Sequence, residues 1–355
     1  MSAFVQQKQR ESNLELFRIV VMLLIVAHHY VVNSGIWEII RSSPAESDSL
    51  FYFFLGMWGK TGINCFVLIT GWFMCTSRIS VRKFLKLLLE IEFYKVVIGI
   101  VFLVSGKESF STDWLLGLLP IRNIKDGFVS CFLVFYLFIP FMNILIRNMD
   151  QKMHLILVGM LLFIYTVLGT IPACSITMNY VSWFCTLYFI ASYLRIYEFP
   201  MKNSRAFSWL WLSMGTLLLS MLSVWAIAYS GKSVSPYWFV SDANKLMALV
   251  TSLCLFNLFK SIRLPYNKLI NSVAATTFGV LLIHAHSDTM RQWLWYDLFD
   301  NAGHFSPFSP FNAILIVLLV FVACSCIDCI RIHLFEEPLF SWLDKHYFVV
   351  KESKQ

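Results

Sequence analysis

Long apolar runs separated by short polar breaks extend along almost the whole chain. Ten of these runs have the length, about 20 residues, that an α-helix needs to cross the hydrocarbon core of a bilayer. They are residues 14–33, 51–75, 84–105, 128–147, 154–172, 181–199, 208–229, 242–260, 271–290 and 311–333. Gly, Pro, Ser and Asn mark most of the breaks, as is typical of turns and loops. The pattern predicts an all-α fold, a polytopic membrane bundle of about ten transmembrane helices.

Composition excludes a soluble protein. The chain has 355 residues, of which 58% are hydrophobic and 14% are charged, whereas a soluble domain has about 45–50% apolar and about 25% charged residues. The first 13 residues are polar, and the apolar run after them has no small-residue cleavage site, so we expect this run to remain as a helix. Since no long linker is evident, we expect a single membrane domain over residues 1–355 without a fused soluble domain.

The net charge of +7 carries information about topology. Ten spans place both termini on the same side of the membrane. If that side is the cytoplasm, 18 Lys and Arg residues fall in inner segments, six fall in outer segments and four lie within spans. Because Lys and Arg are enriched in cytoplasmic loops, this split predicts that both termini are inside. It also explains the positive charge without a nucleic-acid partner.

The first apolar run contains four polar side chains that are costly to place in lipid: Glu15, Arg18, His28 and His29. Arg18 and His29 are eleven residues apart, which on an α-helix is about 20° past three full turns and about 16 Å along the axis. Glu15 falls on the same side as Arg18, whereas His28 is rotated by about 100° from His29. One stripe of the helix therefore carries a carboxylate, a guanidinium and an imidazole, and it should face the bundle or a water-filled cavity.

Two interpretations of this stripe are open. In the first, Glu15 and Arg18 form an interfacial ion pair, and the histidine ring is hydrogen-bonded in the core. In the second, His29 is a general base in a cavity, because a neutral imidazole near pH 7 can take a proton from an attacking hydroxyl. Arg18 would then hold a carbonyl, a phosphate or the neighbouring carboxylate.

The stretch NLELFRIVVMLLIVAHHY (13–30) resembles the first helix of the acyltransferase-3 family of bacterial membrane proteins. The hallmark of that helix is an Arg, ten residues and then a His. Arg18 and His29 have that spacing, whereas Arg18 and His28 do not. Glu15 matches the acidic residue that family members usually carry three positions before the Arg.

Three further stretches carry the same resemblance. NCFVLITGWFM (64–74) is similar to the FFxLSGF pattern of the second helix, and TFGVLLIHAH (277–286) is similar to the late SxGxYLxH pattern. FEEPL (335–339) is similar to the E-x-P or E-P motif that follows the last helix. Because the four motifs occur in the family's order, the resemblance covers nearly the whole chain.

The resemblance implies an integral membrane O-acyltransferase of the bacterial inner membrane. Such proteins transfer an acyl group, usually acetyl, from cytoplasmic acyl-CoA to a hydroxyl of an envelope, capsular or exopolysaccharide glycan. His29 would be the catalytic base, Arg18 and Glu15 would support it, and His284 would bind the substrate. The expected partners are acyl-CoA, a sugar or glycan acceptor and the lipid bilayer. Acetyl-CoA would be the acyl donor, and no metal is expected.

The chain departs from the family pattern in two places. The family often has an R-x-x-R pair in a cytoplasmic loop, and here Arg78, Arg82, Lys83 and Lys86 keep the basic character without that spacing. We expect this basic cluster to bind the phosphates of CoA, with a simple topology anchor as the alternative. Many relatives also carry a fused extracytoplasmic domain that takes the acyl group onward, so here the membrane domain would act alone or with a separate extracytoplasmic protein that handles the acyl group.

Other site chemistries find little support in the sequence. Nine cysteines are scattered along the chain, and CSCIDC (324–329) resembles a metal motif at first sight. On a helix, however, Cys324 and Cys326 point about 200° apart and cannot share one ligand face. The HExxH, P-loop, GxGxxG and GxSxG motifs of other enzyme classes do not occur.

A transporter or exporter of a glycan or lipid-linked sugar is the alternative to an enzyme. Ten spans, short loops and intramembrane charges such as Glu92 and Lys95 would serve a transporter equally well. A glycan polymerase is a third reading, for which a large outer loop would be expected. The Arg-x10-His spacing favours the enzyme, because a transporter has no chemical reason to keep it.

Overall fold

The computed structural model describes residues 11–77, 79–122, 124, 127–174, 176–197, 206–231, 235–305 and 309–348. Helices and turns account for these residues, and no strand occurs among them. The all-α fold class is therefore confirmed. Arg78 of the basic cluster lies outside the described residues.

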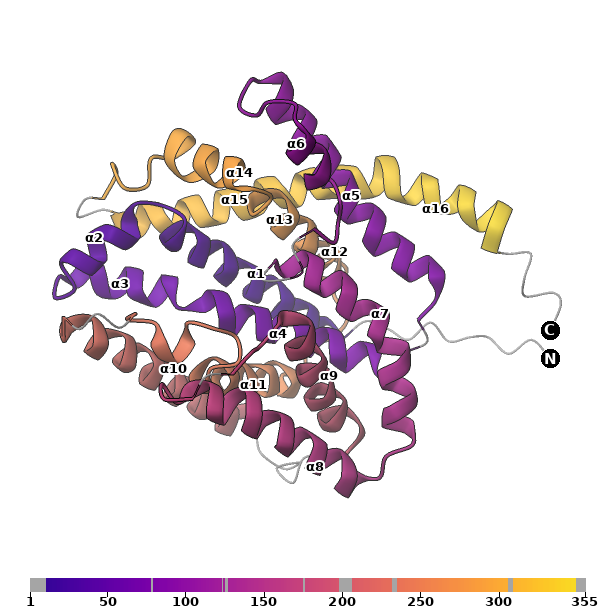
Figure 1. Cartoon of the computed structure of the whole chain (residues 1–355), viewed down its shortest axis with the longest axis horizontal. Helices are drawn as coiled ribbons and strands as arrows, with labels where there is room; N and C mark the ends of the chain where they lie inside the picture. The colour runs from indigo at the N-terminus through magenta and orange to yellow at the C-terminus, as the bar shows by residue number, and fades with distance from the viewer. Residues whose placement is uncertain are drawn as a thin grey trace.

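Each predicted apolar run contains a helix, although the one in the ninth run has only eight residues (Figure 1). These are α1 (Ser12–Val32), α4 (Trp58–Met74), α5 (Val81–Val104), α7 (Phe128–Arg147), α8 (Gln151–Leu162), α9 (Tyr180–Ile196), α10 (Ala206–Tyr229), α11 (Leu246–Ser261), α13 (Thr277–His284) and α15 (Ser309–Arg331). Shorter helices join or extend them: α2 (Ile36–Ser42), α3 (Ser47–Gly56), α6 (Thr112–Gly117), η1 (Phe163–Leu168), η2 (Trp238–Val240), α12 (Lys268–Ala275), α14 (Asp288–Gln292), η3 (Trp293–Leu298), η4 (Ile332–Glu336), α16 (Glu337–Leu343) and η5 (Asp344–Phe348).

Within the described residues, six helices are long and apolar enough to cross a membrane. They are Ser12–Val32, Asp48–Met74, Phe128–Arg147, Gln151–Leu168, Ala206–Tyr229 and Pro310–Tyr347. A seventh arises if Lys268–His284 and Asp288–Leu298, which meet at an angle of 93°, form one broken span. The protein is thus a multi-pass membrane protein, while ten spans with both termini inside stay a prediction.

The last helical stretch is longer than the sequence pattern predicted. The run predicted to end at residue 333 continues to Tyr347, so the FEEPL motif lies within the helical stretch and not after it. Pro338 is tolerated because it occupies the first turn of α16, where a backbone N–H is not needed for the helical hydrogen bonds. The continuation carries Glu336 and Asp344 alongside α5, which they contact.

The ninth predicted run, 271–290, ends earlier than expected. Helix α13 stops at His284, and the chain then turns before α14. The hydroxyl of Ser287 accepts a hydrogen bond from the backbone N–H of Met290 at 3.2 Å, which starts the new helix. This turn places His284 at the end of one helix and Arg291 on the next.

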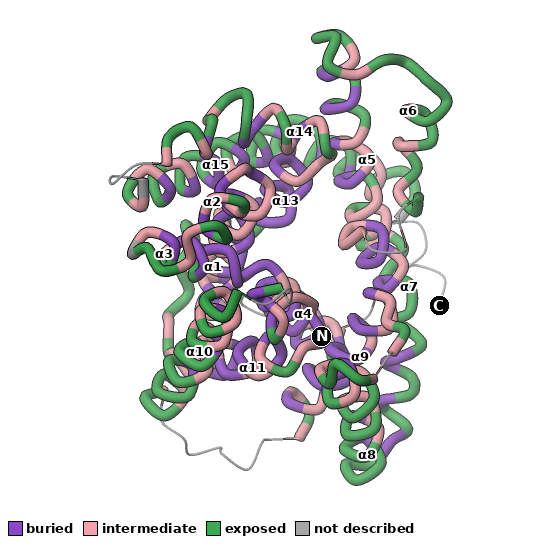
Figure 2. Tube along the Cα trace, turned by 60° about the vertical axis from the view of Figure 1, so that its left-hand side comes forward, coloured by how far each residue is buried: buried purple, intermediate pink, exposed green. Residues whose placement is uncertain are grey.

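Helix α1 is the centre of the bundle. It packs against α3, α4, α11, α12, α13 and α15, and Figure 1 shows it near the middle of the molecule. By contrast, α8 and α10 are mostly exposed in Figure 2, and their exposed side chains include large apolar ones such as Trp211 and Leu218. Apolar side chains on the outside and polar ones near the centre are the arrangement expected of a bundle in lipid.

Helix ends predicted to be cytoplasmic lie together. The Glu11 carboxylate is 3.5 Å from the guanidinium of Arg195 at the end of α9. The side-chain amide of Asn13 donates to the carbonyl oxygens of Phe259 and Lys260 at the end of α11, at 3.0 and 3.2 Å. The start of α1 and the ends of α9 and α11 therefore share one end of the bundle, as the alternating topology requires.

Candidate active site

His29 and His284 contact each other through their rings. Nδ1 of His29 is 2.9 Å from Nε2 of His284, and Nδ1 of His284 is 2.6 Å from the carbonyl oxygen of Val280. A carbonyl only accepts, so the proton of His284 is on Nδ1. His284 is 1% exposed and has no anionic contact, which favours the neutral ring. Its Nε2 then accepts from Nδ1–H of His29, and the lone pair of His29 is left on Nε2.

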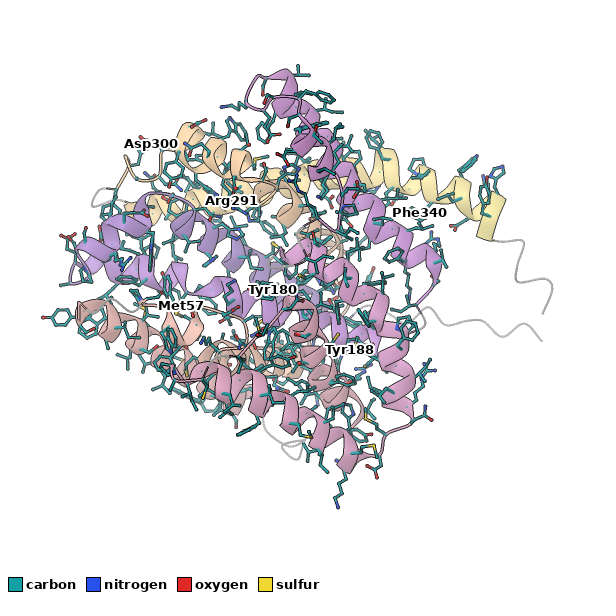
Figure 3. The ribbon with its side chains drawn as sticks, viewed as in Figure 1. Met57, Tyr180, Tyr188, Arg291, Asp300 and Phe340 are labelled. Carbon is teal, nitrogen blue, oxygen red and sulfur yellow. The ribbon has the colours of Figure 1, made fainter. Side chains whose placement is uncertain are left out.

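His29 lines a cavity of about 580 Å³, which we call the His29 cavity. Residues of α1, α4, α5, α7, α9, α13 and α14 form its walls. Figure 3 shows Tyr180 near the middle of the bundle and Arg291 on α14, two of the residues that line it. A substrate in this cavity would lie beside the His29 ring, as the general-base interpretation requires.

The charged lining of the His29 cavity is mainly positive. Lys60, Lys95 and Arg291 contribute cations, and Asp288 contributes the carboxylate. Asp288 is paired with Arg291 at 2.5 Å. Lys60 donates a hydrogen bond to the hydroxyl of Tyr180. Apart from Lys95, these charged residues of the cavity were not among the candidates from sequence. Lys60 is isolated in its apolar run, and Asp288 and Arg291 fall at the predicted end of the ninth run.

His28 lies outside the His29 cavity. Its Nδ1–H donates to the carbonyl oxygen of Gly56 at 2.5 Å, and its ring fills the space over Gly59, where a Cβ atom would overlap it. The predicted rotation between the two adjacent imidazoles is therefore confirmed: one lines the cavity and the other packs between helices.

Arg18 and Glu15 form the predicted ion pair, with a distance of 3.3 Å between guanidinium nitrogen and carboxylate oxygen. Glu15 is buried, and the guanidinium of Arg18 is 6.0 Å from the centre of the Phe66 ring. Phe66 in turn packs at 6.1 Å against Phe128, which lines the His29 cavity. Aromatic rings thus separate the ion pair from His29, and the structure does not bring Arg18 and His29 into contact.

The described members of the basic cluster lie near carboxylates of the last helical stretch. Arg82 makes two hydrogen bonds to Asp344, at 2.7 and 2.9 Å, and Lys86 is 2.6 Å from Glu336. Lys83 is exposed beside them. The predicted binding of CoA phosphates by this cluster stays a prediction, and an incoming phosphate would have to compete with these carboxylates.

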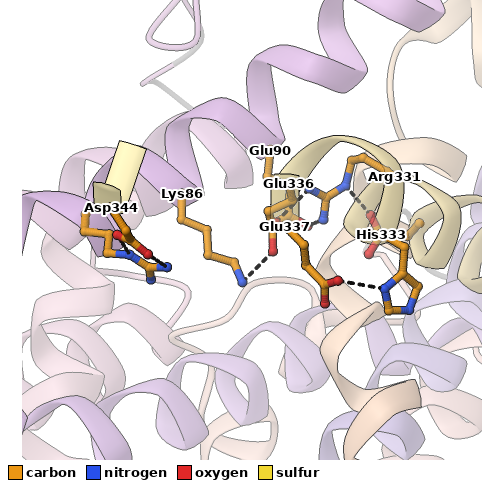
Figure 4. A network of polar contacts seen from close by, with 9 residues as sticks. Lys86, Glu90, Arg331, His333, Glu336, Glu337 and Asp344 are labelled. Atoms are coloured by element: carbon orange, nitrogen blue, oxygen red, sulfur yellow. Dashed lines mark hydrogen bonds and ion pairs between the residues drawn. The ribbon is translucent and has the colours of Figure 1, made fainter. Parts of the chain in front are cut away.

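A buried network around Arg331 was not predicted from the sequence (Figure 4). The Arg331 guanidinium is 2.6 Å from Asp328, 2.8 Å from Glu336 and 3.2 Å from Glu90. The hydroxyl of Tyr94 donates to Asp328 at 2.7 Å. The sequence contained one signal for this network: Asp328 and Arg331 are three residues apart at the end of an apolar run, and buried charges in membrane helices need partners.

Beside this network lies a second cavity of about 580 Å³, which we call the inner cavity. Arg82, Lys86 and Arg331 line it, together with Glu336 and Asp344. Tyr94 lines the His29 cavity and also hydrogen-bonds to Asp328 of the network. The two regions are therefore connected through one side chain of α5.

The three cysteines of the CSCIDC stretch do not share an environment. Cys324 is buried, whereas Cys326 and Cys329 are exposed. This agrees with the prediction that Cys324 and Cys326 point to different sides of the helix.

Together, the membrane-spanning bundle and the His29 cavity define a multi-pass membrane protein with a histidine dyad in its interior. The family model described as an acyltransferase domain matches residues 11–327. The chain therefore belongs to the acyltransferase-3 family and is an acyltransferase. The matched region contains Arg18, His29 and His284. No curated protein and no solved structure matches the chain significantly.

Proposed function

We propose that the protein is a membrane O-acetyltransferase that moves an acetyl group from cytoplasmic acetyl-CoA to a hydroxyl of an envelope, capsular or exopolysaccharide glycan in the bacterial inner membrane. The observation that carries this proposal is the His29–His284 pair, with the basic Nε2 of His29 on a cavity, in a chain of the acyltransferase-3 family. A hydroxyl acceptor needs such a base, because an alcohol is a weak nucleophile until its proton is removed.

The chemistry proceeds with His29 as general base. Nε2 of His29 takes the proton of the sugar hydroxyl while the hydroxyl oxygen attacks the carbonyl carbon of the thioester. A carbon–oxygen bond forms and the carbon–sulfur bond breaks, which gives the acetyl ester and a thiolate. The imidazolium of His29 then returns the proton to the thiolate sulfur, releasing CoA as a free thiol. Donors aimed at the carbonyl oxygen would stabilise the tetrahedral intermediate.

His284 acts through His29 and does not itself line the cavity. Its Nε2 fixes the proton of His29 on Nδ1 and orients the ring. We therefore assign His284 as a positioning residue in place of the substrate contact expected from sequence. It also shares the positive charge when His29 becomes an imidazolium.

Acetyl-CoA would approach from the cytoplasmic end, where Arg18 and the basic cluster of Arg78, Arg82, Lys83 and Lys86 are predicted to lie. In the first helix, Arg18, which is paired with Glu15, is the cation that lies nearest to the route proposed for acetyl-CoA. From the resemblance to the family, we also propose that a separate extracytoplasmic protein can handle the acyl group.

The test uses membranes that contain the full chain, labelled acetyl-CoA and glycan. We expect glycan-dependent consumption of acetyl-CoA and an acetyl ester on the glycan, both lost in His29→Ala. Glycan movement across the membrane without any consumption of acetyl-CoA would instead favour the transporter.

A further inference from the structure

We propose that the acceptor is an anionic glycan, with a carboxylate or phosphate group near the acetylated hydroxyl, and that Lys95 and Arg291 of the His29 cavity bind this group. The inference rests on the proposed function, because it names the class of acceptor for the same site.

Lys95 reaches the cavity without a carboxylate in hydrogen-bonding contact. Its ammonium donates to the carbonyl oxygens of Gly117 and Leu119, at 2.8 and 3.1 Å. Carbonyl groups carry no net charge, and an ammonium has three N–H donors, so one donor is left for a ligand. Glu92, one turn earlier on α5, lines a different, apolar groove.

Arg291 has donors beyond those used by its carboxylate partner. One guanidinium nitrogen is paired with Asp288, whose side chain is 95% exposed. A guanidinium has five N–H donors in a planar fork that fits a carboxylate or phosphate. Counting Lys60, the cavity has three cations against one carboxylate. An anionic ligand would offset this excess, which is costly in a partly dehydrated site.

His286 adds an unsatisfied polar group to the same wall. Both of its ring nitrogens are buried without a well-formed hydrogen bond, although the backbone of Lys95 is close. Its ring lines the His29 cavity and an adjoining cavity of about 520 Å³. Since a neutral imidazole offers one donor and one acceptor, His286 suits the hydroxyl groups of a sugar next to the bound anion.

The adjoining cavity has the lining expected for a neighbouring sugar ring. Trp114 lines it together with Glu108 and Ser111. The indole of Trp114 lies over Gly99, where an added Cβ would approach the ring to 3.3 Å, so the absence of a side chain makes room for it. An apolar ring face beside a few polar groups is typical of small-ligand sites. In this lining two cations, Lys95 and Lys107, are balanced by two carboxylates, Glu108 and Asp113, so the excess of positive charge that would select an anion belongs to the His29 cavity.

The experiment compares matched acceptors with the full chain in proteoliposomes. One acceptor is a uronic-acid oligosaccharide, the second is the same oligosaccharide with its carboxyl groups reduced to alcohols, and the third is a phosphate-bearing oligosaccharide. We expect kcat/KM for at least one anionic acceptor to exceed that of the neutral one by about 10-fold or more, the usual worth of a charge-assisted hydrogen bond. Comparison of the uronic-acid acceptor with the phosphate-bearing acceptor then shows which anion is bound.

Variants of the cavity cations identify the side chains that cause the preference for anionic acceptors. Lys95→Gln and Arg291→Gln should each reduce the ratio between anionic and neutral acceptors, by raising KM for the anionic one. Arg41→Gln is the matched control, because Arg41 is an exposed cation on α2 that lines none of these cavities. It should keep the full ratio.

Three outcomes would overturn the inference. Equal kcat/KM for neutral and anionic acceptors would do so while His29-dependent acetyl transfer, and thus the proposed function, still stands. A rise of KM for acetyl-CoA alone in Lys95→Gln and Arg291→Gln would assign these cations to the donor. No consumption of acetyl-CoA with any acceptor would overturn the proposed function, and the inference with it.

Discussion

The His29 cavity and the inner cavity have the same volume, about 580 Å³, but the charges of the inner cavity balance, whereas those of the His29 cavity are mainly positive. In the inner cavity four basic side chains face four carboxylates: Arg82, Lys86, Arg331 and Lys345 against Glu90, Glu336, Glu337 and Asp344. In the His29 cavity three cations, Lys60, Lys95 and Arg291, face the single carboxylate of Asp288. Figure 4 shows ion pairs among these charges, such as that of Lys86 with Glu336, and the pair of Glu337 with His333 outside the cavity lining.

The difference separates charges that hold helices together from charges that are available to a ligand. The Arg331 network joins α5 to the last helical stretch, so its charges are used within the protein. The cations of the His29 cavity outnumber the carboxylates that line it. Substitutions should therefore reduce stability in the first region and acyl transfer in the second.

The largest expected effect on stability is that of Arg331→Leu. Removing the guanidinium leaves Asp328 and Glu90 buried without this counter-ion, while Glu336 keeps its pair with Lys86. Breaking a buried ion pair costs about 3–5 kcal/mol. Unfolding of the purified protein in detergent should show this loss. Arg122→Gln, which breaks an exposed pair with Asp113, is the control and should change little. If both variants unfold alike, the network does not stabilise the bundle.

His284→Ala should reduce acyl transfer without unfolding the protein. His29 would lose the acceptor that fixes its proton on Nδ1, and misplacing a catalytic group can lower kcat by about 10- to 100-fold. The KM values should stay near those of the unmodified protein, since His284 does not line the cavity. His284→Gln, whose side-chain oxygen can accept the same hydrogen bond, should restore part of kcat. Equal rates for Ala and Gln would argue against a positioning role.

The alanine substitution of Gly279 tests how closely α13 approaches the Arg331 network. A Cβ at this position would overlap the carboxylate of Asp328, and overpacking of a filled interior typically costs about 1–3 kcal/mol. Gly215→Ala on α10 is the control, because nothing lies within 4 Å of its added Cβ. Thermal unfolding in detergent should show that Gly279→Ala is less stable than Gly215→Ala. Equal stability of the two variants would contradict this packing.

The smallest effect is expected for Arg82→Gln. Its pair with Asp344 is between side chains that are 42% and 36% exposed, and such pairs contribute about 0–1 kcal/mol. Stability should barely change, and KM for acetyl-CoA should rise mildly if the basic cluster binds CoA. An unchanged KM and unchanged salt dependence would leave the cluster as a topology anchor.

Periodicity within one helix could be predicted from sequence, and contacts between distant helices could not. The Glu15–Arg18 pair and the different directions of His28 and His29 follow from 3.6 residues per turn. The contact of His29 with His284 joins residues 255 positions apart, and helical periodicity carries no information about it. Motif resemblance pointed to His284, but only the packing of α13 against α1 shows that its ring contacts His29.

The last helical stretch shows a second limit of sequence patterns. Polar residues such as Glu336 and Asp344 predicted a break near residue 333, because isolated charges are unfavourable in a membrane helix. In the structure these carboxylates meet Lys86 and Arg82 of α5, which lets the helix continue. A partner on another helix therefore decides whether a charge ends a span.

Acetyl transfer by His29→Ala and His28→Ala, measured at matched expression in membranes with acetyl-CoA and glycan, tests the role of the dyad most directly. Loss of a general base lowers the rate by about 10²- to 10⁴-fold, so His29→Ala should form almost no acetyl ester. His28→Ala should retain much of the activity, since the His28 ring faces Gly56 and not the cavity. Normal acetylation by His29→Ala, or loss of activity in His28→Ala alone, would contradict the assignment of His29 as the base.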